Sequence, residues 1–215
     1  QVLDLDTGEI RKAVLKDVSD MARIVDALDN IHFFLIPIYP TDLPEGQVEI
    51  NKYYASLANT TKHVQAGVYT LRGIRDVVAV CEEIAGSPEA LRARPLVSFI
   101  TSWMVSPLKF ATDVTALLIE TCRQGIPVVL SAAPMAGSTS PVTLAGTLVQ
   151  LNAEQLSGLT LTQLVNPGTP VIMGPIPATA DMRSGKYLGG SVELGISNAA
   201  ITQLAHLYQV PIYNS

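Results

Sequence analysis

Three aromatic side chains follow runs of apolar residues, and their position suits the binding of a cation. Tyr39, Tyr69 and Trp103 each lie at or near the end of such a run. The faces of aromatic rings attract positive charge, so three rings together can enclose a quaternary ammonium group. The same residues also suit the border of a core, where the ring is buried and its polar tip reaches water. We take all three as candidate substrate-binding residues and keep both interpretations open.

A second pair of candidate residues carries opposite charges. Asp181 and Arg183 lie two residues apart in a loop that contains Gly185 and follows a short apolar run. The carboxylate could face a cationic substrate and the guanidinium an anionic group, which makes both candidate catalytic residues. A structural ion pair within the loop would account for them equally well.

The loop before a long apolar segment contains glycine, serine and threonine. The spacing predicts Ser140 as the N-cap of a helix and Pro141 as its first residue. Exposed N–H groups at a helix start favour anions, so a carboxylate or phosphate could bind near Ser140, our fourth candidate substrate-binding residue. Plain helix capping explains the loop as well, because a phosphate-binding P-loop would need a lysine that is missing here.

The helix predicted after this loop carries polar residues in an otherwise apolar segment. Gln150 and Glu154 are four residues apart, so they share one face of the helix, whereas Asn152 points elsewhere. Polar groups in so apolar a helix need partners or water. The sequence favours a solvated outer face for this pair.

Composition and charge exclude several classes of function. The net charge is −5 with no run of Lys or Arg, which argues against nucleic acid as a partner. The three histidines and two cysteines show no metal-ligand spacing, so neither a metal nor a directly bound cofactor is expected. No apolar stretch is long enough to span a bilayer. We expect a cytoplasmic protein, because two isolated cysteines do not form a disulfide framework.

Apolar runs and helix-period segments alternate along the chain after a short hairpin at about residues 1–14. The runs are bounded on both sides by loops and are apolar on both faces, as in a covered parallel sheet. Six strands are predicted: Phe33–Ile38, His63–Tyr69, Leu96–Met104, Ile126–Ala132, Pro170–Met173 and Val210–Tyr213. The predicted helices between them are Glu45–Ala58, Leu71–Ala85, Phe110–Arg123, Pro141–Val165 and Ser191–Tyr208.

This alternation predicts an α/β fold that fits either an open doubly wound sheet or part of an eight-stranded barrel. No glycine-rich dinucleotide motif follows the first strand, and the polar loops follow the carboxyl ends of the strands, where barrel sites lie. Both features favour an incomplete parallel (β/α)8 barrel of the TIM type. We expect one partial barrel domain over residues 1–215, which looks cut at both ends and is a candidate for self-association.

Several blocks of the sequence together have the character of a family signature, and the most specific is the glycine- and hydroxyl-rich loop with the helix after it. The blocks, in order, are Val2–Gly8, Asn59–Lys62, Ala133–Leu148, Asn152–Glu154, Leu164–Gly168 and Asp181–Gly185. They resemble segments of the MttB family, the trimethylamine and glycine betaine methyltransferases. The resemblance therefore covers essentially the whole chain.

The resemblance implies a (β/α)8 barrel that removes a methyl group from a methylated amine and passes it to cobalt. The family's corrinoid is held by a separate corrinoid-binding protein, so the barrel itself would bind no metal. For a betaine, Arg183 or the helix start near Ser140 is a plausible anchor for the carboxylate. Two alternatives remain: another barrel enzyme acting on a phosphorylated metabolite, and a fragment that binds a quaternary ammonium without catalysis.

Overall fold

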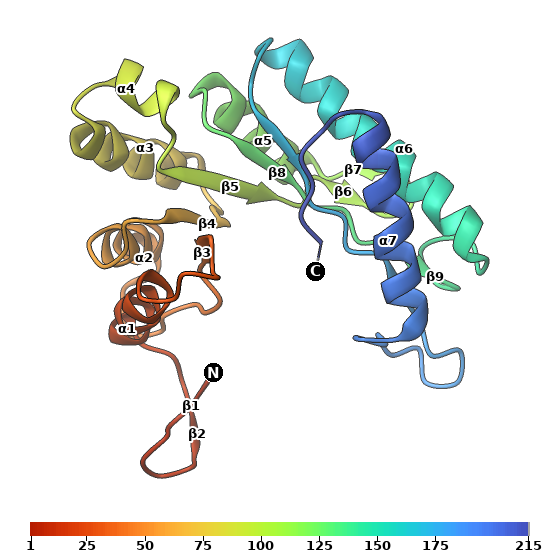
Figure 1. Ribbon diagram of the computed structural model, residues 1–215, viewed down its shortest axis with the longest axis horizontal. Coiled ribbons are helices and arrows are strands. Elements are labelled where there is room, and N and C mark those ends of the chain that lie inside the picture. The colour runs from red at the N-terminus through yellow and green to blue at the C-terminus, as the bar shows by residue number, and fades with distance from the viewer. Residues whose placement is uncertain (215) are drawn as a thin grey trace. The chain divides into compact units, whose positions relative to one another are not determined.

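Strands and helices alternate along most of the chain (Figure 1). The structure, a computed structural model, describes residues 1–214. The chain divides into two compact units, one over residues 1–99 and one from residue 100 onward. Among the described residues, no helix has both the length and the apolar character that a membrane crossing requires.

The first unit begins with an antiparallel hairpin in which β1 pairs with β2, and continues as alternating helices and parallel strands. Its elements are β1 (Val2–Leu3), β2 (Ile10–Arg11), α1 (Leu15–Asp26), β3 (Phe33–Leu35), the 3₁₀ helix η1 (Glu45–Gln47), α2 (Val48–Leu57), β4 (His63–Gly67), α3 (Leu71–Ala85) and α4 (Pro88–Ala93).

Strands β3 and β4 lie side by side in the same direction, with Phe33 opposite His63 and Leu35 opposite Gln65. This register brings their carboxyl ends to one edge of the sheet. Three residues lie between the end of β4 and the start of helix α3, so the helix starts near that edge. Thr70 is its N-cap and accepts a hydrogen bond from the N–H of Gly73. The helix ends at Gly86, whose φ of 89° is a left-handed conformation that glycine adopts without steric cost.

The second unit contains the longest helix and two short accessory pairs of strands, the antiparallel β6–β7 and the parallel β9–β11. Its elements are β6 (Met104–Val105), β7 (Lys109–Phe110), α5 (Thr112–Arg123), β8 (Val128–Leu130), β9 (Met135–Ala136), α6 (Leu144–Val165), β10 (Val171–Met173), β11 (Ala178–Thr179) and α7 (Val192–Leu207). Helices α6 and α7 lie side by side (Figure 1).

Strand β5 (Val97–Thr101) runs across the boundary between the units, and the main strand order is β10-β8-β5-β4-β3. The order follows the chain, and β8 and β10 pair in parallel, as β3 and β4 do. The predicted α/β class with a parallel sheet is therefore confirmed. Parallel pairing within each unit is what an incomplete (β/α)8 barrel contains. The sixth predicted strand is a single parallel bridge between Met173 and Ile212.

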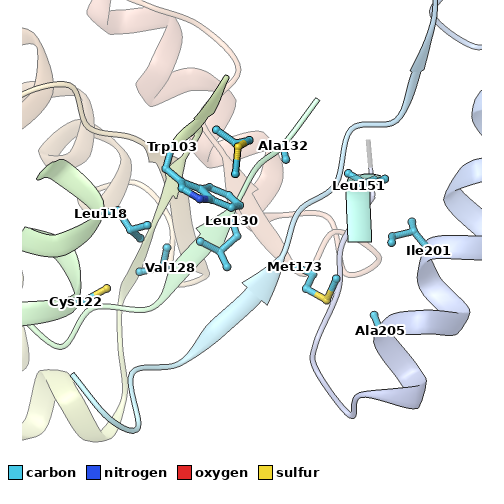
Figure 2. Close-up of a cluster of buried hydrophobic side chains, with 11 residues drawn as sticks. Trp103, Leu118, Cys122, Val128, Leu130, Ala132, Leu151, Met173, Ile201 and Ala205 are labelled. Carbon is cyan, nitrogen blue, oxygen red and sulfur yellow. The ribbon is translucent and has the colours of Figure 1, made fainter. Parts of the chain in front are cut away.

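The core of the second unit lies between its strands and the inner faces of α5, α6 and α7. Figure 2 shows Leu130 and Met173 from the strands together with Leu151 of α6 and Ile201 of α7. All four side chains are fully buried. Fully burying a Leu, Ile or Met side chain contributes about 1.5–3 kcal/mol, so this cluster fixes the helices against the strands.

Candidate active site

Tyr39 and Tyr69 form an aromatic pair at the carboxyl ends of β3 and β4. Because the two strands are parallel neighbours, the loops that leave them carry these tyrosines to the same edge. The ring centroids are 6.3 Å apart and the ring planes are inclined by 57°. Tyr39 is 46% exposed and Tyr69 is 63% exposed, so both rings are open to a ligand.

The two tyrosines line a pocket of about 300 Å³ together with residues of η1, α2 and the loop before α3. This volume is at the lower end of the range for small-molecule sites. We define the aromatic–acidic pocket by its five lining residues, which are Tyr39, Glu45, Glu49, Tyr69 and Thr70. Partial burial, with Tyr39 and Glu49 nearby, raises the pKa of the Tyr69 phenol, which therefore stays neutral at pH 7.

The carboxylate of Glu49 is held rigidly by the loop after β4. It accepts hydrogen bonds from the backbone N–H of Tyr69, from the N–H of Thr70 at 3.1 Å and from the Thr70 hydroxyl at 2.5 Å. Gly73 allows this approach, because a Cβ atom there would lie 2.0 Å from Glu49 Oε2. The contact fixes the backbone from which the Tyr69 side chain extends.

Lys52, on the same helix as Glu49, is a buried amine behind Tyr69. Its Nζ donates a hydrogen bond of 2.7 Å to the carbonyl of Gly67 and lies 4.9 Å from the centroid of the Tyr69 ring. The residue is 3% exposed. Burial lowers the pKa of Lys52 to about 8, an effect that the nearby Glu49 charge partly offsets. Nothing in the spacing of the sequence predicted this lysine or Glu49 as part of the site.

Glu154 of α6 is fully buried and holds the turn between β6 and β7, while its neighbour Gln150 connects it to the loop after β9. Its carboxylate accepts hydrogen bonds from the Ser106 hydroxyl at 2.9 Å, the Leu108 N–H at 3.1 Å and the Gln150 amide at 3.0 Å. The Gln150 amide also donates to the carbonyl of Thr139 at 2.9 Å. The shared helix face of Gln150 and Glu154 is confirmed, but the expectation that this face is solvated is wrong. The sequence signal was the presence of polar residues in an apolar helix.

Trp103 lies in the core, which corrects the position expected for it from the sequence. Its ring is fully buried, and Figure 2 shows it beside Leu130. Helix α6 approaches the indole at Gly158, where a Cβ atom would lie 2.3 Å from Trp103 Cζ2. The ring therefore offers no face to a ligand in this structure, because α6 covers the position where the predicted strand ends.

Ser140 does not cap the helix, contrary to the prediction. Helix α6 begins at Leu144, and Thr143 is the N-cap, accepting from the N–H of Gly146. The Ser140 hydroxyl instead lies 2.9 Å from that of Thr147. The helix starts later because Ser140 continues a turn that closes on Met135.

The N–H groups of this turn are already used. Those of Ser138, Thr139 and Ser140 donate to the Met135 carbonyl, and that of Gly137 donates to the carbonyl of Ser140. None of these four groups is left to cradle a phosphate, which argues against a phosphate site at this loop.

Asp181 and Arg183 lie in an exposed turn between β11 and α7. The Asp181 carboxylate accepts from the Ser184 hydroxyl at 2.6 Å and from the Arg183 N–H at 2.9 Å. Both bonds lower the pKa of the Asp181 carboxyl, and the bond from Ser184 has the larger effect. The Arg183 side chain takes no part in them, so the loop is held by the Asp181 carboxylate and backbone rather than by an ion pair between the two residues.

His63 and the two cysteines have structural environments. His63 lies at the start of β4, with Nε2 2.8 Å from the Ser98 hydroxyl, and burial lowers its pKa. Burial raises the pKa of the Cys81 thiol to about 12 and that of Cys122 to about 11, so both remain protonated and unreactive at neutral pH.

Parallel strands that alternate with helices place this chain among the α/β proteins. Most of its candidate site residues lie in the loops that follow the strands. A crystal structure of dihydropteroate synthase from Stenotrophomonas maltophilia, with imidazole bound in its active site, has a similar fold, with a TM-score of 0.57. The match covers 95% of this chain and 71% of that one, at 12% identity. It concerns the fold alone.

Sequence comparison identifies the family within that class. The family model "Trimethylamine methyltransferase (MTTB)" matches residues 1–215, so the chain belongs to this family. It is 36% identical to trimethylamine methyltransferase MttB of Desulfitobacterium hafniense over 98% of this chain, and to MttB of Methanosarcina barkeri over 94%. It is also 36% identical to a glycine betaine methyltransferase of D. hafniense over 98%.

The chain spans 41% to 44% of the length of these relatives. Family membership confirms the resemblance that the glycine- and hydroxyl-rich loop indicated. It applies to both units, because the match runs through the whole sequence.

Proposed function

We propose that the protein containing this chain transfers a methyl group from a methylated amine to the cobalt of a separate corrinoid protein. The observation that carries the proposal is the family match over residues 1–215. The aromatic pair supports an ammonium substrate, because one cation can lie within about 6 Å of both ring centroids when these are 6.3 Å apart.

A quaternary ammonium substrate suits this chemistry. When the methyl carbon bonds to cobalt, its bond to nitrogen breaks, and the nitrogen keeps the electron pair and leaves as a neutral tertiary amine. No proton has to be delivered. The protein's task is then to hold the ammonium group and to aim one methyl group at the corrinoid partner.

The remaining candidate residues are assigned supporting roles in this proposal. Asp181 and Arg183, in their turn of the second unit, are kept as candidate catalytic residues, and Ser140 is proposed to help shape the loop after β8. Glu154 is proposed as a positioning residue, because it fixes the Ser106–Leu108 turn from inside the fold.

The test is a methyl-transfer assay with the whole protein, cobalt(I) corrinoid protein and a panel of tetramethylammonium, glycine betaine and trimethylamine. Methylcobalamin formation, followed by its absorbance, is expected with at least one amine. The double variant Tyr39→Leu/Tyr69→Leu should lose most of the activity, whereas Tyr54→Leu, an exposed tyrosine elsewhere on α2, should keep it. A lack of methyl transfer from every amine would contradict the proposal.

A further inference from the structure

We propose that the aromatic–acidic pocket binds a quaternary ammonium cation that carries no carboxylate group. The inference rests on the proposed function and deepens it, because it chooses among methylated amines. It depends on the charges and the geometry of the five lining residues.

The charges of the pocket select against a second, anionic group on the ligand. Two of the five lining side chains, Glu45 and Glu49, are carboxylates, and none is a lysine, arginine or histidine. Both carboxylates attract an ammonium group and repel the carboxylate of a betaine. Arg72 lines the adjoining hollow instead, and its guanidinium is paired with Asp76 at 3.3 Å.

The remaining groups match a nitrogen that has no N–H donor. A quaternary nitrogen cannot donate a hydrogen bond, so it is recognised by aromatic faces and by fixed negative charge. The tilted rings of Tyr39 and Tyr69 supply the faces. The Glu49 carboxylate is already oriented by the Tyr69 and Thr70 N–H groups, so little is lost in ordering it when a cation binds.

The fold itself places one cation against the Tyr69 ring. The Lys52 ammonium lies 4.9 Å from the Tyr69 centroid, although Lys52 is not among the lining residues. The Tyr69 ring therefore interacts with positive charge in the protein as it stands. A ligand cation would meet the ring from the pocket side, where attraction by the Glu45 and Glu49 carboxylates opposes the repulsion from the single Lys52 ammonium.

Calorimetric titration of the whole protein at pH 7 tests the inference with three probes that share a centre bearing three methyl groups. These are tetramethylammonium, glycine betaine and the neutral 3,3-dimethyl-1-butanol. Tetramethylammonium is expected to bind at least about tenfold more tightly than either of the others. Betaine binding with equal or greater affinity would overturn the inference.

Variants locate the binding. Glu45→Gln and Tyr39→Leu should each weaken tetramethylammonium binding by about two- to fivefold, as expected for one exposed charge or one ring. The control Glu83→Gln, an exposed glutamate on α3, should leave it unchanged. Unchanged binding in both pocket variants would also overturn the inference.

The two proposals fail in different ways. If tetramethylammonium binds as described but no amine supports methyl transfer, the proposed function fails and the pocket assignment stands. If methyl transfer proceeds from betaine while tetramethylammonium does not bind, the pocket assignment fails and the proposed function stands.

Discussion

At the residue scale, the site depends on short polar contacts that hold its aromatic side chains. Glu49 ties the backbone of Tyr69 and Thr70 to α2, and Lys52 ties the carbonyl of Gly67 to the same helix. Both residues are on a helix that faces the strand end, so one element supplies a fixed carboxylate and a buried amine. The amine is the more costly of the two, because burial disfavours its charged form.

The buried Lys52 predicts a pH dependence of stability. Its pKa is about 8 in the folded protein and 10.5 for a lysine exposed to water, as in the unfolded chain, so the unfolded chain binds more protons between these pH values. The free energy of unfolding should therefore rise with pH from about 8 to 10.5, by about 3 kcal/mol in all. Below pH 8 the full cost of burying the charge is present.

Urea unfolding of the whole protein at several pH values checks this. Lys52→Met should remove the rise, and the exposed Lys12→Met should keep it. The same slope in wild type and in Lys52→Met would show that Lys52 is not its source.

The sequence predicted the tyrosines of the site but not the charged groups around them. The end of an apolar run in the sequence marks the end of a strand. Tyr39 and Tyr69 lie at such ends, so the sequence was enough to predict where they lie. The partners of Lys52 and Glu49 lie 15 to 21 residues away. Helix periodicity places a residue on a face but does not say which backbone atoms that face meets. Trp103 was misplaced for the same reason, because Gly158 of the helix that covers its ring comes 55 residues later.

At the element scale, α6 organises the second unit. It is apolar around most of its surface, so packing rather than a single stripe determines its orientation. Gly158 lets the helix backbone meet the Trp103 ring, and Glu154, one turn earlier, anchors the turn that contains Ser106 and Leu108. Leu108 has a φ of 52°, a strained conformation for leucine, which its N–H bond to Glu154 helps to hold.

Gly158→Ala is expected to destabilise the protein by about 1–3 kcal/mol. A Cβ atom would lie 2.3 Å from the indole, and neither a helix backbone nor a buried ring can move away cheaply. Gly195→Ala in α7 is the matched control, because no atom lies within 4 Å of its Cβ position. There the better helix propensity of alanine should stabilise by up to about 1 kcal/mol. Urea unfolding of both variants measures the contrast, and equal effects would contradict it.

Glu154→Gln is expected to cost about 2 kcal/mol of stability. The amide presents N–H groups toward donors that now bond to a carboxylate, so at least one charge-assisted hydrogen bond is lost. Hydrogen exchange of the Leu108 amide should accelerate at the same time. Glu193→Gln, an exposed glutamate in the first turn of α7, should change stability by less than about 0.5 kcal/mol. Unchanged protection of Leu108 would argue against the anchoring role.

At the scale of the whole molecule, each unit contains a pair of parallel strands, β3 and β4 in the first unit and β8 and β10 in the second. The alternation of apolar runs and helices predicted the class, the parallel direction and five of the strands. Strand lengths were overestimated, as for Phe33–Ile38, whose observed strand ends at Leu35. Apolar character marks burial, whereas a strand also needs a hydrogen-bonding neighbour at each position. The proposal of a single barrel domain over the chain stays a prediction.

The order of strands predicts that the sheet continues past β10 at residues 210–213. The Tyr213 N–H donates to the Met173 carbonyl at 3.0 Å, and the Met173 N–H donates to the Pro211 carbonyl at 2.8 Å. Tyr213→Pro removes the first donor and should lower stability by about 1–3 kcal/mol. Hydrogen exchange of β10 in the whole protein should accelerate as a result. Tyr213→Ala keeps the N–H and separates the backbone effect from loss of the side chain. If β10 exchanged equally slowly in both variants, residues 210–213 would not be part of the sheet, and the succession of parallel strands would end at β10.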